Sequence, residues 1–361
     1  MKVLFLTQTG PHGASARYRV YQYLDYIKAS GIEFYVSPAI PDGLLEKYCN
    51  SNNYFTKVQF YATQIIKRLR DIQKVSKFDI IFMQRDLVVH IYPFLEKLIA
   101  LFNKRIIFDF DDAIYLYPTH KKTGLFFKLL WDRKKIKRII GLSKHVIAGN
   151  NFLKEYSEKF TKNVSVIPTS IDLNLYRLNK PKTAKISEVV NIGWMGSQGT
   201  FSYLEDIFPV FEELAKKYNI ELTVIGAKGS SLDGVRVNYK DWSLDKEIDD
   251  INCFDIGVMP LVDDEWSRGK CGTKLLQYMA AGVPAVGSPV GVNIEIINNG
   301  VTGLLAQTRE DWVKNISLLI EDQGLRSRLV NNARNHVDKF YSVQANAPKF
   351  LEIIKRVALG S

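Results

Sequence analysis

The pattern with the clearest chemistry is the stretch GKCGTKLLQYMAAGVP at positions 269–284. Gly269 and Gly272 lie in a loop ahead of a predicted helix, so unpaired backbone N–H groups and the helix dipole point into that loop. Lys270 and Lys274 are one helical turn apart and can bring two ammonium groups to the same place. The pattern predicts a site where a diphosphate is bound without a metal ion. An ordinary loop and helix with solvated lysines is the alternative.

A second group of residues could complete a nucleotide site. Gly196 and Ser197 follow the predicted strand VVNIGWM in a short loop of small residues, and we expect Thr200 at the N-cap of the next helix. Tyr239 and Trp242 lie at the loop after a middle strand of the second half of the chain, where they could line a base. A plain turn and a tryptophan packed between helix and sheet are the alternatives.

Three carboxylates follow the predicted strand RIIF. Strand alternation puts Asp109 and Asp111 on one face and Asp112 on the other. Carboxylates this close repel one another unless they are solvated, paired or bound to a cation, so a metal site is conceivable here. We expect none, because the two lysines supply the phosphate charge.

Cationic residues also follow the first predicted strand. Arg17 and Arg19 lie beyond Gly13 and His12 in the stretch TQTGPHGASARYR. Two arginines at the edge of a sheet could bind a phosphate or a carboxylated acceptor, with ordinary solvation as the alternative. His12 could touch a bound donor from the same loop.

The elements that must position these residues alternate along the chain as apolar strands and amphipathic helices, which predicts an α/β fold. The alternation restarts after the polar stretch 178–188, so we expect two doubly wound parallel-sheet domains, residues 1–182 and 183–341. Ligands bind at the carboxyl ends of such strands. Two facing domains would therefore form a central cleft.

Composition and charge narrow the possibilities. Apolar residues make up 46% and charged residues 24% of the 361 residues, which is typical of a globular protein. Three scattered cysteines suit a reducing compartment, and no stretch is long and apolar enough to span a membrane. We expect a cytoplasmic protein. The 30 basic and 15 acidic residues of 1–182 make that half the one attracted to polyanions.

Much of this positive charge lies in the segment 120–144, where nine Lys and Arg residues are interleaved with aromatic and aliphatic side chains. Such a segment predicts an interfacial helix resting on the inner face of an anionic membrane. The alternative is a surface helix whose apolar side packs on its own sheet. Nucleic acid is not expected as a partner, since base-stacking context is missing elsewhere.

The run KLLQYMAAGVPAVGSPVGVNIEIINNGVTGLLA resembles the nucleotide-sugar-binding region of glycosyltransferase family 4, which has the GT-B fold of two Rossmann-like domains. The segments NIGWMGSQGTFSYL, DIGVMPL, VSVIPTSIDLNLY and FDFDDAIY agree in order. Gly269 and Gln277 stand where that family carries glutamates, and the resemblance places Gln277 at the donor ribose. It also places residues 342–361 as a last helix packing back onto the first domain.

The resemblance implies a retaining, metal-independent glycosyltransferase without a cofactor, using a nucleoside-diphosphate sugar, with UDP favoured over GDP. It places Lys270, Lys274, Gly196 and Ser197 at the donor phosphates and Asp111, with Asp109 second, at the sugar or acceptor. A glycan or lipid-linked acceptor in the synthesis of cell-surface polysaccharide or glycolipid is expected. The alternatives are a GT-B epimerase or hydrolase of nucleotide sugars, and a non-catalytic nucleotide-sugar or membrane-surface binding protein.

Overall fold

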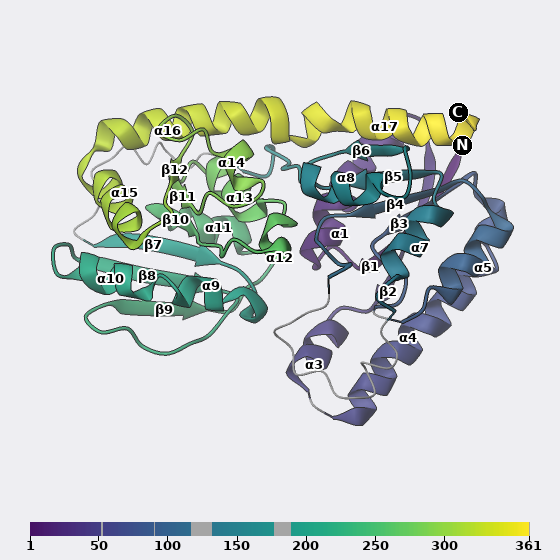
Figure 1. Ribbon diagram of the computed structural model, residues 1–361, viewed down its shortest axis with the longest axis horizontal. Helices are drawn as coiled ribbons and strands as arrows, with labels where there is room; N and C mark the ends of the chain where they lie inside the picture. The colour runs from purple at the N-terminus through teal and green to yellow at the C-terminus, as the bar shows by residue number, and fades with distance from the viewer. Residues whose placement is uncertain (52, 90, 117–131, 177–188, 361) are drawn as a thin grey trace. The chain divides into compact units, whose positions relative to one another are not determined.

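The computed structural model describes residues 1–51, 53–89, 91–116, 132–176 and 189–360 (Figure 1). The chain forms two compact units, one made of Met1–Thr169 and Asn346–Ser361 and the other of Ser170–Ala345. The second unit thus begins ahead of the stretch 178–188, which lies outside the described residues. The chain returns to the first unit inside its last helix.

The sheet of the first unit has six strands in the order β2-β1-β3-β4-β5-β6, and all neighbours pair in parallel. The central strands β3 and β4 are buried along their whole length, because their sequences IIFMQ and IIFDF leave no side for water. The strands are β1 Lys2–Thr9, β2 Glu33–Ile40, β3 Ile80–Gln84, β4 Ile106–Phe110, β5 His145–Ala148 and β6 Val164–Val166.

Helices cover both faces of this sheet. Helix α4 contacts α5, and α5 contacts α7, so these three form one layer. On the other face, Phe350 of α17 stacks on Tyr23 at 4.6 Å between ring centroids and also touches Phe82 of β3. The helices are α1 Ala14–Arg19, α2 Leu24–Ala29, α3 Leu44–Asn50, α4 Tyr54–Ile72, α5 Phe94–Phe102, α7 Lys135–Leu142, α8 Asn151–Glu158 and α17 Val343–Leu359, with short 3₁₀ turns η1 Tyr21–Tyr23 and η2 Val75–Lys77.

The second unit repeats the plan with the strand order β12-β11-β10-β7-β8-β9, again parallel throughout. Its strands are β7 Val190–Met195, β8 Ile220–Ile225, β9 Arg236–Lys240, β10 Ile256–Met259, β11 Ala285–Gly287 and β12 Leu304–Leu305. Its helices are η3 Gln198–Thr200, α9 Ser202–Glu205, α10 Phe208–Ala215, α11 Glu247–Asn252, α12 Glu265–Arg268, α13 Thr273–Ala280, α14 Asn293–Ile296, α15 Arg309–Glu321, α16 Gln323–His336 and η4 Val337–Tyr341.

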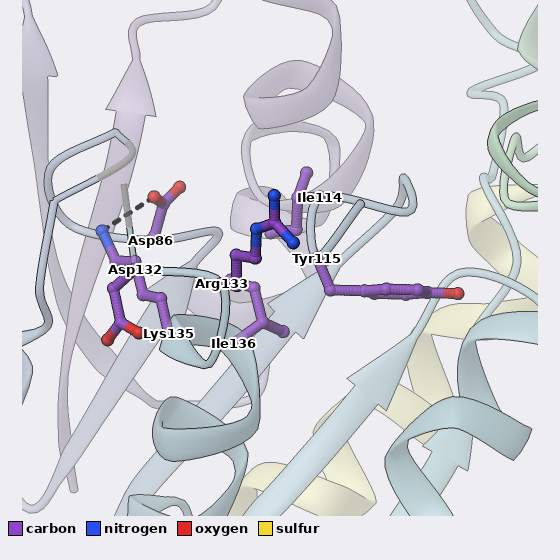
Figure 2. Close-up of a pocket in the computed structure, with 7 residues that line it drawn as sticks. All are labelled: Asp86, Ile114, Tyr115, Asp132, Arg133, Lys135 and Ile136. Carbon is purple, nitrogen blue, oxygen red and sulfur yellow. Dashed lines mark hydrogen bonds and ion pairs between the residues drawn. The ribbon is translucent and has the colours of Figure 1, made fainter. Parts of the chain in front are cut away.

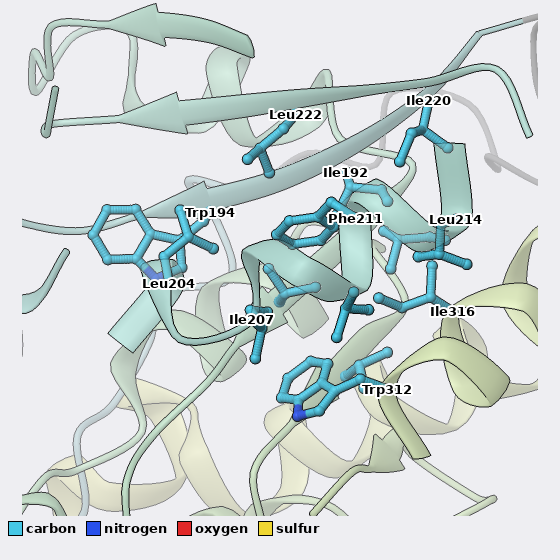
Figure 3. Packing of buried hydrophobic residues seen from close by; sticks show 14 of the residues in the cluster. Ile192, Trp194, Leu204, Ile207, Phe211, Leu214, Ile220, Leu222, Trp312 and Ile316 are labelled. Carbon is cyan, nitrogen blue, oxygen red and sulfur yellow. The ribbon is translucent and has the colours of Figure 1, made fainter. Parts of the chain in front are cut away.

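The largest core of this unit lies between its sheet and helices α10 and α15. Figure 3 shows Trp194 and Ile192 of β7 facing Phe211 of α10 and Trp312 of α15. These side chains are at most 3% exposed. Trp194 is next to the last residue of β7, so its burial in this core anchors the carboxyl end of the strand. The loop of Gly196 begins there.

The expected fold class is confirmed: both units are doubly wound parallel sheets. None of the helices in the described ranges is long and apolar enough to cross a membrane.

Candidate functional site

The loop that opens α13 requires glycine at one position. Gly272 caps the helix with a left-handed backbone (φ +65°), and a Cβ there would lie 2.2 Å from Ile296 Cδ1. No side chain caps the helix. Its first backbone N–H groups therefore keep the anion-binding capacity expected from the sequence.

Lys274 and Gly196 lie together, as the sequence predicts. The ammonium of Lys274 is 5.0 Å from the ring centroid of Trp194, and a Cβ at Gly196 would lie 2.9 Å from Lys274 Cε. The ammonium of Lys270 lies 5.4 Å from the ring of Trp266 and 6.0 Å from that of Tyr203. Both lysines are half-buried, so aromatic faces hold two cations at the carboxyl edge of the sheet.

The loop after β7 is held by two contacts that keep its small residues in place. The backbone N–H of Met195 donates to Tyr278 Oη at 3.1 Å, and Gln198 exchanges two hydrogen bonds with the backbone of Lys228. Ser197 is exposed. The expected N-cap role of Thr200 is wrong: Thr200 ends the 3₁₀ turn η3, and its hydroxyl donates to the Ser197 carbonyl at 3.0 Å.

Gln277 and Trp242 meet at a carboxylate that the sequence analysis missed. Gln277 Nε2 donates to Glu247 Oε1 at 2.9 Å, and Trp242 Nε1 donates to Glu247 Oε2 at 2.7 Å. Gln277 also donates to Tyr176 Oη at 3.3 Å. Glu247 is 5% exposed and Gln277 2%. A buried carboxylate from α11 thus stands directly beside the position where the resemblance expects a glutamate.

Trp242 also approaches the loop of Gly196. Gly226, after β8, has φ +83°, and a Cβ there would lie 2.6 Å from the Gly196 carbonyl oxygen and 3.3 Å from Trp242 Cβ. Tyr239 lies apart from this group. It lies inside β9, an edge strand of the sheet, and its hydroxyl donates to the Ser230 carbonyl at 2.6 Å. The expected position of Tyr239 in the loop after that strand is therefore wrong.

A hollow of about 280 Å³ opens at the carboxyl ends of β10, β11 and β12. Tyr203 lines the hollow, and its ring also faces the ammonium of Lys270, so this lysine lies next to the hollow. Its other lining residues include Leu261, Ser288 and Trp312. This space and the lysine pair make the carboxyl edge of the second sheet the strongest candidate site in the chain.

In the first unit, Asp109 forms a buried ion pair with Arg19. The guanidinium donates from Nε to Oδ1 and Oδ2 at 3.0 and 3.1 Å and from Nη2 to Oδ2 at 2.6 Å. The two side chains are 1% and 0% exposed. Burial raises the pKa of Asp109 to about 6 against the opposing charge of Arg19. The expected position of Arg19 at an open edge is therefore wrong, and Asp109 is held inside the fold.

Asp111 lies at the surface edge and has other partners. Ser15 Oγ donates to Asp111 Oδ2, and Arg85 Nε is 3.7 Å from Asp111 Oδ1. Arg85 also pairs with Asp112 at 2.9 Å, so the two carboxylates share one guanidinium. The expectation that Asp112 points away is wrong, because β4 ends at Phe110 and strand alternation ends with it.

Arg85 was not found from the sequence. It follows β3 directly and is the one non-glycine residue with positive φ (+62°) in the described ranges. Its backbone N–H donates to the Asp109 carbonyl at 2.8 Å. This uncommon backbone conformation aims the guanidinium at the neighbouring strand end.

The other residues expected near Arg19 are held locally. Arg17 is 8% exposed, and its Nη1 donates to the Pro11 carbonyl at 3.2 Å. His12 is exposed and pairs with Asp42 at 3.1 Å. Gly13 is required where it stands, since a Cβ there would lie 1.9 Å from Thr9 Oγ1.

The segment 120–144 is described only from residue 132 onward. There the interfacial interpretation is wrong: Ile136, Ile139 and Ile140 are buried, so the apolar side of α7 packs inside its own unit. Lys135 is 4% exposed and binds Asp86 at 2.9 Å (Figure 2). The cavity there is about 20 Å³, which suits one water molecule and no substrate.

Across the described ranges, no group of three or more His, Cys, Asp or Glu side chains could hold a metal ion. The three carboxylates at positions 109, 111 and 112 are paired with arginines instead.

Comparison with known proteins identifies the domain that carries the lysine site. Residues 255–336 match the family model described as glycosyl transferases group 1. Sucrose-phosphate synthase from Thermosynechococcus elongatus is 14% identical, with a TM-score of 0.72 over 100% of this chain and 99% of that one. HepE from Anabaena, in complex with UDP and glucose, is 15% identical, with a TM-score of 0.65 over 98% and 99%. The lipopolysaccharide outer core galactosyltransferase WaaB is 14% identical, with a TM-score of 0.61 over 98% and 99%.

The structural likenesses confirm the fold, and the matched domain confirms the expected enzyme class. The matched range includes α13 with Lys274 and Gln277 and begins after Glu247. Assignment to family 4 stays a prediction.

Proposed function

We propose that this chain, which carries a group 1 glycosyltransferase domain, transfers a sugar from a nucleoside-diphosphate sugar to a glycan or lipid-linked acceptor. The observation that carries the proposal is that Lys274 of α13 lies against Trp194 and Gly196, at a helix start that no side chain caps, while Lys270 lies in the loop just before that helix. Two cations and a helix N-terminus at one sheet edge are suited to the negative charge of a diphosphate.

The donor is proposed to be a UDP-sugar rather than a GDP-sugar. The HepE structure contains UDP and glucose, and its chain is similar to this one over nearly its full length. We place the diphosphate against Lys270 and Lys274, with the backbone at Gly196 and Ser197. Gln277, Trp242 and Glu247 then form the group nearest the nucleoside, where the carboxylate of Glu247 supplies the negative charge that Gln277 lacks.

Transfer is proposed to retain the anomeric configuration and to need no metal ion. In this mechanism the acceptor hydroxyl approaches the face from which the diphosphate leaves, and the departing phosphate oxygen takes its proton. The lysines stabilise the negative charge that grows on the diphosphate as the bond breaks. Asp111 is assigned to position the sugar or acceptor and to stabilise positive charge developing at the anomeric carbon.

The test is a donor panel with a chelator present throughout. The chain is incubated with UDP-glucose, UDP-galactose and GDP-mannose, each with and without an oligosaccharide or polyprenyl-phosphate sugar acceptor, and released nucleotide and product are measured. Acceptor-dependent UDP release with an unchanged anomeric configuration is expected. UDP release that does not depend on the acceptor would indicate a hydrolase, and conversion of the free nucleotide sugar to an epimer would indicate an epimerase. A product with inverted anomeric configuration would contradict the mechanism.

A further inference from the structure

Helix α4 carries a stripe of exposed apolar side chains along its outer side. Phe55 is 77% exposed, Val58 45%, Ile66 50% and Leu69 43%. At 100° per residue these four positions fall within an arc of about 80° on one side of the helix. Tyr54, at the start of the helix, adds a ring that is 72% exposed.

The opposite side of α4 fixes the helix to its sheet. Phe60, Gln64 and Arg68 are buried there. Arg68 donates to the Thr7 and Ser37 carbonyls at 2.6 and 2.8 Å and pairs with Asp71. Rotation that would hide the apolar stripe would break these buried contacts, so the stripe is a fixed feature of the surface.

The neighbouring helix α5 extends this apolar surface. Phe94 is 42% exposed, Leu101 72% and Phe102 58%. Helices α4 and α5 contact each other and run along the same side of the first unit (Figure 1). We call the outer surface of these two helices the α4–α5 face.

The exposed charge in the range 53–105, which includes both helices, is almost entirely positive. Of the four acidic residues in the range 53–105, Asp71, Asp86 and Glu96 are buried, which leaves Asp79 as the exposed one. The exposed cations over the same range are Arg70, Lys74, Lys77, Lys97, Lys104 and Arg105. An apolar surface bordered by cations is complementary to an interface whose interior is apolar and whose border is anionic.

We propose that the α4–α5 face binds the surface of an anionic lipid bilayer. Phe55, Val58 and Phe102 enter the boundary between headgroups and acyl chains, and the cations contact lipid phosphates. A second copy of the chain fits this face poorly, because a two-fold interface would set its cations against the same cations of the partner. The proposal rests on the surface alone and is independent of the donor chemistry, so either can fail without the other.

The experiment is sedimentation of the full chain with vesicles of phosphatidylcholine containing about 30% phosphatidylglycerol, at low salt. We expect binding that rises with phosphatidylglycerol content and falls between about 50 and about 300 mM salt. Neutralisation of Arg70, Lys74 and Lys77 by glutamine should weaken binding about 100-fold, at roughly fivefold for each cation. Phe55→Ser combined with Val58→Ser should weaken it at least about tenfold.

The matched control is Ile294→Ser combined with Val301→Ser, which removes two exposed apolar side chains from the second unit. Circular dichroism and thermal unfolding establish that each variant folds. The proposal is overturned by equal binding to neutral vesicles, by equal losses in the control and the α4 variants, or by no binding at low salt. It is also overturned if wild type sediments as a dimer that Phe55→Ser converts to a monomer while vesicle binding is unchanged.

Discussion

The substitution Asp109→Asn should mainly destabilise the first unit, although Asp109 and Asp111 are both candidate catalytic residues by sequence. The Arg19–Asp109 pair contains three hydrogen bonds of 2.6 to 3.1 Å between side chains that are at most 1% exposed. Neutralising the carboxylate leaves the buried guanidinium without its counter-charge. Removing one partner of such a pair costs about 3 to 5 kcal/mol in the free energy of unfolding.

Urea and thermal unfolding followed by circular dichroism measure this loss. At about 2 to 4 °C for each kcal/mol in a unit of this size, the Tm of the first unit should fall by roughly 10 °C. The matched control is Asp111→Asn, two residues away, where the carboxylate is 13% exposed and its Oδ1 lies 3.7 Å from Arg85 Nε, so the loss should be smaller than for Asp109→Asn. Replacing both partners by apolar residues, as in Arg19→Met with Asp109→Leu, should restore much of the stability. Unchanged stability of Asp109→Asn would refute the reasoning.

Two further outcomes are expected. Asp111→Asn should lower kcat by about 10²-fold with UDP affinity nearly unchanged, since losing one electrostatic stabiliser costs about 2.7 to 4 kcal/mol. Steady-state kinetics measures kcat and calorimetry measures UDP affinity. A near-normal kcat would show that Asp111 takes no part in the chemistry. Burial lowers the pKa of His145 to about 4, and Arg356 adds to the effect, so the unfolded chain takes up a proton that the folded chain does not as the pH falls below about 6.5. The free energy of unfolding of wild type should then fall by about 2 to 3 kcal/mol more than that of His145→Gln between pH 7.5 and pH 4.5, and parallel pH profiles in urea unfolding would contradict this.

The parallel sheets and the lysine site are predictable from the sequence because both rest on local patterns. Mostly apolar runs without polar alternation, such as IIFM of β3 and IIF of β4, are typical of parallel strands buried on both faces by helices. The convergence of Lys274 with Gly196 follows from the shared carboxyl edge of the sheet. The expectation that Lys270 lies one helical turn from Lys274 is wrong, because α13 begins at Thr273 and Lys270 lies in the loop before it.

What the sequence could not provide are contacts between distant positions. Nothing near Arg19 indicates that its partner lies 90 residues away in the sequence, and Glu247 joins Trp242 to Gln277 only once α11 is packed. Arg85 depends on a left-handed backbone that no local motif signals. The cations of 132–144 indicated an exposed face, but Lys135 is buried by its pairing with Asp86. The pattern of charges along a sequence therefore does not show whether a given lysine side chain points to solvent or into the fold.

Binding of UDP in the presence of a chelator tests the central claim most directly. Calorimetry on wild type should show one site for UDP. Lys274→Met keeps the aliphatic chain against Trp194 while removing the ammonium, and should weaken binding by about 1.5 to 3 kcal/mol, the worth of a hydrogen bond to a charged group. Lys228→Met, which removes an exposed lysine from the loop after β8, is the matched control and should bind as wild type. Equal affinity of wild type and Lys274→Met for UDP would contradict the account.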